Sequence, residues 1–142
     1  MKVLPNHLPS LLLSGAVYSA LGSKEQAETN LRKVLDSAPD NLLARRLLTA
    51  LLLRAKQPQR AVEIIEPVLA RGIDDPQMLA LAGDAYMQSG DYEKATQYLE
   101  KAASIDPKSA NIRTGLGLSR LAGGEASAAM ADLEKAATMD SD

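Results

Sequence analysis

The chain has no cysteine, no tryptophan and no phenylalanine, and each absence excludes a class of structure or chemistry. Without cysteine there can be no disulfide, no thiolate metal site and no thiol nucleophile. Tyrosine is the only aromatic residue, at 3% of the chain, so the core has to be built from Leu, Ala, Ile, Val and Met. Because this set of residues is rich in strong helix formers, the composition favours an all-helical protein.

An excess of one charge sign and long hydrophobic runs are also missing. The net charge is −2, with 16 basic and 18 acidic residues spread along the chain, unlike a nucleic-acid-binding surface. The longest apolar stretches, such as Leu11–Leu13 and Leu51–Leu53, fall far below the roughly 20 residues that span a bilayer. The start of the chain lacks the apolar segment of a signal peptide. We therefore expect no nucleic acid and no membrane contact, and either a cytoplasmic protein or a fragment of a longer one.

Candidate catalytic and metal-ligating residues are few. His7 is the only histidine, and no partner lies near it in the sequence, so we interpret it as a surface residue. Metal sites usually need several His, Cys or carboxylate ligands, and Asp74–Asp75 is better explained as a turn and a helix cap. Neither a G-x-S-x-G motif nor a G-x-x-x-x-G-K-[ST] phosphate loop is present. The sequence thus predicts a protein that is not an enzyme, with no catalytic residue, no metal and no cofactor.

The chain does contain a repeat of 34 residues that runs without gaps. An alanine recurs once per period, and an aliphatic residue follows it four positions later. These pairs are Ala27 and Leu31, Ala61 and Ile65, Ala95 and Leu99, and Ala129 and Leu133. Glycine recurs at two further positions, at Gly15, Gly83 and Gly117 and at Gly22, Gly90 and Gly124, where the second unit has Thr49 and Lys56. The predicted units are 8–41, 42–75, 76–109 and 110–142, within a single domain over residues 1–142.

Each unit carries two helical patterns that are separated by a short turn. In the third unit, Ala82 and Tyr86 lie on one face of the first helix, and Ala95 and Leu99 on one face of the second. The turn Ser89–Asp91 supplies glycine for a left-handed position and aspartate for an N-cap. Small residues at the recurring positions predict a close approach of the two helices. Pro67, inside the second helix of unit two, predicts a local bend.

Unit three resembles the tetratricopeptide repeat nearly throughout. The residues that carry the resemblance are Leu79, Ala82, Gly83, Tyr86, Gly90, Asp91, Tyr92, Ala95, Leu99, Ala102, Asp106 and Pro107. The resemblance extends over about residues 8–142 and is weakest in unit two, which lacks the turn glycine and the terminal proline. Unit four has Arg113 and Arg120 where a bulky apolar residue and a tyrosine are usual. The resemblance implies an all-α right-handed superhelix, a solenoid of eight helices in four helix-turn-helix units, that acts as a protein-interaction scaffold.

A second resemblance concerns a bacterial family. The stretches Leu4–His7, Ala44–Leu48 and Leu116–Leu121 are similar to parts of the tetratricopeptide lipoproteins that accompany exosortase sorting and exopolysaccharide systems. Those proteins are exported and lipid-anchored, and they have many repeats. This resemblance implies the periplasm or cell envelope as the location, with the chain as an internal fragment; otherwise we expect the cytoplasm.

In the tetratricopeptide family the first helix of each unit lines the concave wall, and its positions can be transferred to this sequence. The residues of this predicted lining are Leu12, Ala16, Ser19, Leu43, Arg46, Ala50, Leu53, Arg54, Gln77, Asp84, Met87, Gln88, Asn111, Thr114 and Leu118. The mixture suits an extended or helical protein segment with an apolar anchor and one or two carboxylates, which Arg46 and Arg54 would bind. Only Arg46 matches the family's two-carboxylate clamp, so we do not expect a chaperone-tail ligand.

Two alternatives to a ligand in the concave wall stay open. The basic run of unit two, which includes Arg45 and Arg60, is also explained as a solvated face paired with Glu63 and Glu66. The chain would then be a structural segment of a long solenoid. The second alternative is self-association, because the apolar residues of helix 126–139 lie on more than one side of it. We expect part of that surface to meet a further repeat or another copy.

Overall fold

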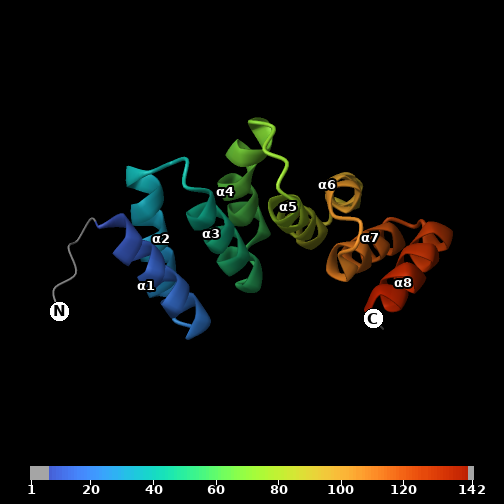
Figure 1. Ribbon diagram of the computed structural model, residues 1–142, viewed down its shortest axis with the longest axis horizontal. Coiled ribbons are helices and arrows are strands. Elements are labelled where there is room, and N and C mark those ends of the chain that lie inside the picture. The colour runs from blue at the N-terminus through green and yellow to red at the C-terminus, as the bar shows by residue number, and fades with distance from the viewer. Residues whose placement is uncertain (1–6, 141–142) are drawn as a thin grey trace. The chain divides into compact units, whose positions relative to one another are not determined.

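The computed structural model describes residues 7–140, and the regular elements in this range are eight α-helices (Figure 1). In chain order they are α1 (Leu8–Ala20), α2 (Lys24–Ser37), α3 (Leu42–Arg54), α4 (Pro58–Ala70), α5 (Pro76–Ser89), α6 (Tyr92–Ile105), α7 (Ala110–Ala122) and α8 (Ala126–Asp140). Two helices fall in each 34-residue unit, so the predicted all-α fold of four helical hairpins is confirmed. Pro67 does not end α4, which continues to Ala70.

Contacts divide the chain into two compact units, one up to Ile64 and one from Ile65 onwards. In the first unit α1 packs on α2, and both of them contact α3. In the second unit α5 packs on α6 and α7 on α8, while α5 and α6 also contact α7. Within each unit, neighbouring hairpins therefore cover apolar faces that a single hairpin would leave in water. The assignment of residues 1–142 to one domain stays a prediction.

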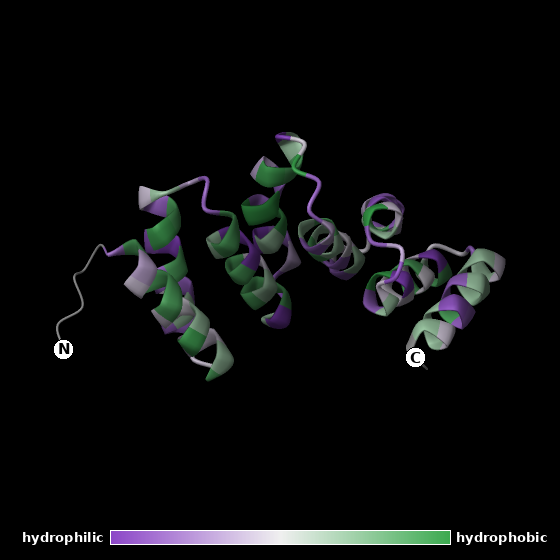
Figure 2. Ribbon diagram, viewed as in Figure 1, coloured by the Kyte–Doolittle hydropathy of each residue, from purple (hydrophilic) through white to green (hydrophobic). Residues whose placement is uncertain are grey.

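The core of the second unit is built from aliphatic side chains. One cluster contains Leu79, Leu99 and Leu116, and a second contains Ile65 and Met78. Figure 2 shows hydrophobic and hydrophilic residues interspersed along each helix. Each helix can thus bury one face and expose another, as the sequence period predicts.

Glycine on the first helix of a hairpin faces leucine on the second. A Cβ atom placed on Gly83 would lie 2.5 Å from Cγ of Leu99, and one placed on Gly117 would lie 2.8 Å from Cγ of Leu133. The same contact recurs at Gly15, where the distance to the facing leucine would be 2.9 Å. These separations leave no room for a methyl group, which confirms that small residues allow the two helices to approach closely.

The N-termini of α1, α3, α5, α6 and α7 are capped by the side chain that precedes each helix. Asp75 accepts a hydrogen bond from the Gln77 amide at 2.9 Å, so the expected cap is confirmed. At the start of α1, Nδ1 of His7 accepts from the Ser10 amide at 3.3 Å. The only histidine is therefore the exposed N-cap of the first helix.

The turn inside each hairpin has the same hydrogen bond in all four units. An amide after the turn donates to a carbonyl five residues earlier, which is the long bond of a Schellman motif. The pairs are Ser23 to Tyr18 at 2.8 Å, Gln57 to Leu52 at 2.9 Å, Asp91 to Tyr86 at 2.9 Å and Glu125 to Arg120 at 2.7 Å. The residue before the donating amide is left-handed, and it is glycine in three units. In unit two it is Lys56, with φ of 59°.

We expect Lys56→Gly to raise the free energy of unfolding by about 1 kcal/mol. The left-handed conformation costs a residue with a Cβ atom about 1–2 kcal/mol, and part of the gain is offset by the greater entropy of glycine in the unfolded chain. Urea denaturation measures the change. The control is Lys56→Ala, which removes the charge but keeps the Cβ atom. A glycine variant no more stable than this alanine variant would contradict the prediction.

Candidate partner-binding surface

In the compact unit that ends at Ile64, the predicted lining lies on α1 and α3. Leu43 and Arg54 are exposed, and the half-buried members are Leu12, Ala16, Arg46 and Ala50. Arg54 donates a hydrogen bond to Oγ of Ser19, which joins the C-terminal ends of the two helices. Leu53 is only 5% exposed, so it belongs to the core and offers no surface to a partner.

In the compact unit that begins at Ile65, the predicted lining lies on α5 and α7. Its exposed members are Gln77, Asp84, Gln88, Asn111 and Leu118, and its half-buried members are Met87 and Thr114. Withdrawal from water raises the pKa of the Asp84 carboxyl above its ordinary value, although part of the residue still reaches solvent. A cation beside Asp84 would relieve this cost. The lining as a binding surface stays a prediction in both units.

Two members of the basic run have structural partners. Nε of Arg45 donates to the carbonyl of Pro39 at 2.9 Å, and its Nη1 donates to the carbonyl of Ile64 at 2.7 Å. Arg45 thus ties α3 to the preceding turn and to α4. Arg60 donates to Glu28 from α4 to α2. These partners differ from the expected Glu63 and Glu66, because the repeat brings the second helices of units one and two side by side.

Glu28 is the anionic centre of this contact between α2 and α4. It accepts from Nε of Arg32 at 2.9 Å as well as from Arg60. Burial by itself would raise the pKa of Glu28, but the hydrogen bonds from Arg32 and Arg60 outweigh it and lower the pKa below its ordinary value. Arg60 is therefore engaged within the fold.

Unit four holds an ionic cluster where unit three has an aromatic pair. Asp132 is buried, and its carboxylate binds Arg120 and, at 3.5 Å, Arg113. Arg120 also pairs with Glu100 at 2.6 Å. Sequence reasoning noticed the two unusual arginines but missed Asp132. The signal was available, because Asp132 stands at the repeat position of Tyr98.

The corresponding aromatic pair in unit three is Tyr86 and Tyr98. Their rings stack with centroids 5.5 Å apart, and the hydroxyl of Tyr86 donates to Glu66. Burial and this hydrogen bond raise the pKa of Tyr86. The same pair of positions is therefore filled by stacked rings in one unit and by opposite charges in the next.

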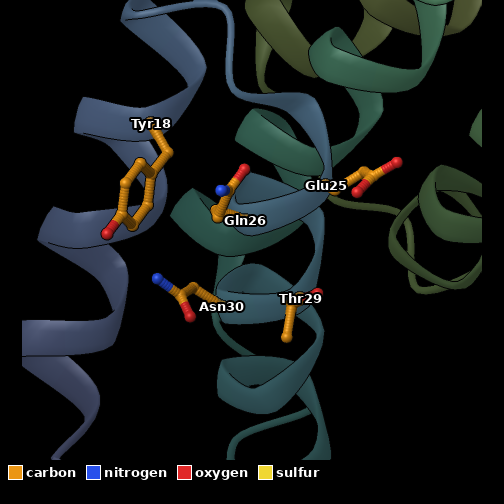
Figure 3. Close-up of a pocket in the computed structure, with 5 residues that line it drawn as sticks. All are labelled: Tyr18, Glu25, Gln26, Thr29 and Asn30. Atoms are coloured by element: carbon orange, nitrogen blue, oxygen red, sulfur yellow. The ribbon is translucent and has the colours of Figure 1, made fainter.

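A pocket of about 370 Å³ lies between α1 and α2. Figure 3 shows Gln26 and Asn30 of α2 extending toward the ring of Tyr18 on α1. Glu25 and Thr29 complete the lining, so every side chain that lines the pocket carries a polar group. Within residues 7–140, acidic and histidine side chains do not gather in a group that could hold a metal ion. In the same range, none of the helices has the length and hydrophobicity that crossing a membrane requires.

The helical hairpins stack through a recurring apolar contact, and their accessible face carries both apolar and polar side chains. These two features define a repeat protein of the interaction-scaffold class. Comparison with known families agrees. A model described as a tetratricopeptide repeat matches residues 19–85, and one described as a TPR repeat matches residues 83–124. The chain contains tetratricopeptide repeats.

Individual relatives share the same repeat. A TPR repeat-containing protein of Pseudomonas aeruginosa is 33% identical over 64 residues, which are 45% of this chain and 61% of that relative. The match thus spans less than two thirds of the relative's length. The structure of MamA from Desulfovibrio magneticus RS-1 is 26% identical, with a TM-score of 0.88 over 96% of this chain and 77% of that chain. Another MamA crystal structure, 23% identical, has a TM-score of 0.87 over 96% of this chain and 80% of that chain.

Proposed function

We propose that this protein is an interaction scaffold that binds a protein or peptide segment on the faces of its first helices. The observation that carries the proposal is the surface of α3, where exposed Leu43 and Arg54 flank half-buried Arg46 and Ala50. An apolar anchor and basic groups on one preformed helix suit a segment with an apolar side chain and a carboxylate. Because the helix is already ordered, binding costs little conformational entropy on the scaffold side.

The hydrogen bond of Arg54 supports a carboxylate as part of the ligand. Its partner in the structure is the neutral hydroxyl of Ser19. A carboxylate forms stronger, charge-assisted hydrogen bonds with a guanidinium, so a ligand can take the place of the hydroxyl. Ser19 would then serve as the internal partner that positions Arg54 before the ligand arrives.

We expect the double variant Arg46→Ala/Arg54→Ala to bind such a ligand about tenfold or more weakly, since each charged hydrogen bond contributes about 1.5–3 kcal/mol. The ligand is a peptide selected from a display library on the immobilised chain, and isothermal titration calorimetry measures its affinity. The matched control is Lys24→Ala/Lys101→Ala, which removes two charges from second helices and should leave the affinity unchanged. Equal affinity of a folded arginine variant, checked by circular dichroism, would remove Arg46 and Arg54 from the mechanism.

The location that we propose for this scaffold is the bacterial cell envelope, within an exosortase or exopolysaccharide system. The support is the sequence resemblance of Ala44–Leu48 and Leu116–Leu121. The third stretch that carries it, Leu4–His7, lies outside the described residues except for His7. Genes for an exosortase beside the gene of this protein would favour the proposal, and fractionation of the native protein into the cytoplasm would contradict it.

A further inference from the structure

The outer face of α1 exposes a row of large apolar residues at helical spacing. Leu13, Val17 and Leu21 follow one another four residues apart, and Leu13 and Leu21 are 67% and 72% exposed. Val17 shares its repeat position with Leu51, Ala85 and Ser119, and all three of these are buried. At this position α1 therefore exposes a residue that the other first helices bury, and the position of Leu13 is half-buried in the other three units.

Apolar residues are also exposed on α8, the last helix of the described chain. Met130 is 58% exposed, and Leu133 is half-buried although Leu31, Ile65 and Leu99 at the same repeat position are fully buried. Ala137 is exposed, whereas Ala103 at its repeat position is buried. The predicted apolar surface of α8 thus exists, interrupted by Glu134 and bounded by polar residues.

The contact between α6 and α7 shows how two such faces fit together. Oγ1 of Thr96 donates to Oγ of Ser119 at 3.0 Å. The same repeat positions hold Met130 on α8, one period after Thr96, and Val17 on α1, three periods before Ser119. The hydrogen-bonded hydroxyls of the internal contact are thus replaced by two apolar side chains, both of which are exposed.

Side-chain size is also complementary between the two faces. In the internal contact, large Tyr92 lies beside Gly123, whose added Cβ atom would be 3.6 Å from Cβ of Tyr92. At the same repeat positions α8 begins with small Ala126, and large Leu21 is the C-cap residue of α1. The large and the small residue have exchanged helices, so the pair keeps a similar total volume.

A polar pair matches as well. Tyr86 donates to Glu66, and Arg120 pairs with Glu100 one period later. One period further on, the acidic position is Glu134, which is exposed on α8. If the first repeat of a second copy followed α8, its residue facing Glu134 would be Tyr18, which stands at the repeat position of Tyr86. Tyr18 and Glu134 would therefore reproduce the hydrogen bond between Tyr86 and Glu66.

We propose that the α8 face of one copy binds the α1 face of a second copy, head to tail and in the 34-residue register. This contact uses different surfaces from the predicted lining, so it goes beyond the proposed function. Because the two faces are different, each copy keeps one face available, and the assembly grows beyond a dimer. The occupant of each face is a helix of the same repeat type, which is what the other three hairpins use to cover these positions.

A disulfide trap tests the register, since the chain has no cysteine of its own. We expect the double variant Val17→Cys/Met130→Cys to form a ladder of disulfide-linked dimers, trimers and larger species under mild oxidation. The Thr96 and Ser119 oxygens at these repeat positions form a hydrogen bond of 3.0 Å, so the two side chains meet in the internal contact. The control is Val17→Cys/Lys135→Cys, because the repeat position of Lys135 is exposed in all four units. A ladder from the control, or none from the test variant, would overturn the proposal.

Two variants, each with one of the two faces blocked by a charge, test whether the contact is head to tail. Val17→Asp blocks the α1 face and Met130→Asp blocks the α8 face. By sedimentation velocity, wild type should grow in average mass between about 1 µM and 1 mM, while each variant alone stays monomeric. An equimolar mixture of the two variants should form a complex of two chains and stop there. Self-association of either variant alone, a monomeric mixture or a monomeric wild type would overturn the proposal.

Two controls accompany the sedimentation experiment. Both substituted side chains are exposed, so circular dichroism spectra and melting curves of the variants should match those of wild type. Arg46→Ala/Arg54→Ala should self-associate as wild type does. Failure of head-to-tail binding is therefore distinguishable from failure of the proposed ligand surface.

Discussion

Replacing Asp132 by alanine should lower the free energy of unfolding by about 3–5 kcal/mol, the largest loss that we expect from one substitution. The Asp132 side chain is 7% exposed and binds two arginines, Arg113 and Arg120, which are themselves mostly buried. Their Nε atoms are buried without a hydrogen-bond partner among the described residues. Without the carboxylate, Arg113 would lose its ion pair in a poorly hydrated site and Arg120 would keep only Glu100. Urea denaturation at neutral pH measures the loss.

A second variant tests whether apolar packing can replace the ionic cluster. It copies the uncharged residues that unit three has at the same repeat positions. The substitutions are Arg113→Leu, Arg120→Tyr and Asp132→Tyr, which copy Leu79, Tyr86 and Tyr98 into unit four. The triple variant should be as stable as wild type or more stable by about 1–4 kcal/mol, as is usual when a buried ion cluster becomes a packed apolar one. Asp132→Ala with a loss under about 1 kcal/mol, or a triple variant no better than Asp132→Ala, would contradict this account.

The second large effect that we expect is at Gly83, where alanine should lower the free energy of unfolding by about 1–3 kcal/mol. An added Cβ atom would lie 2.5 Å from Cγ and 2.9 Å from Cδ2 of Leu99, so the two helices would have to move apart. Alanine favours a helix over glycine by about 1 kcal/mol, and the clash has to exceed this gain. Thermal and urea unfolding both measure the net change.

Gly115 provides the control for helix propensity. It lies in α7, and an added Cβ atom would be 3.3 Å from Cδ2 of the same Leu99, a contact that a small shift of the leucine relieves. Gly115→Ala should therefore be neutral or stabilising by up to about 1 kcal/mol. If both alanine variants changed the stability equally, the close packing of Gly83 on Leu99 would not be the reason for its glycine.

Most of the fold could be predicted from the sequence because the repeat makes each position visible four times. The glycine that faces a leucine, the left-handed turn and the Asp75 cap all follow from local rules that recur at a fixed spacing. Each of them depends on a contact within one hairpin. The period therefore specifies the helices and their pairing without knowledge of distant residues.

The predicted surface was less accessible to sequence reasoning. Leu53 has the composition of a lining residue, but its side chain is buried, and one-dimensional positions do not reveal such burial. For the basic run that includes Arg45 and Arg60 the sequence suggested Glu63 and Glu66 as partners, whereas Arg45 donates to the Ile64 carbonyl and Arg60 to Glu28. Asp132 was missed because a lone acidic residue in a helix normally indicates a solvated face. Its partners become evident only when Arg113 and Arg120 are placed around it.

The most direct test of the scaffold function is to map a selected peptide ligand on the chain by NMR. We predict that the largest chemical-shift changes on binding fall on first helices, with Leu43, Arg54 and Gln88 among the affected residues. Second-helix positions such as Lys33 and Lys101 should stay unchanged. Changes concentrated on α2, α4, α6 and α8, with Leu43 and Arg54 unaffected, would contradict the account.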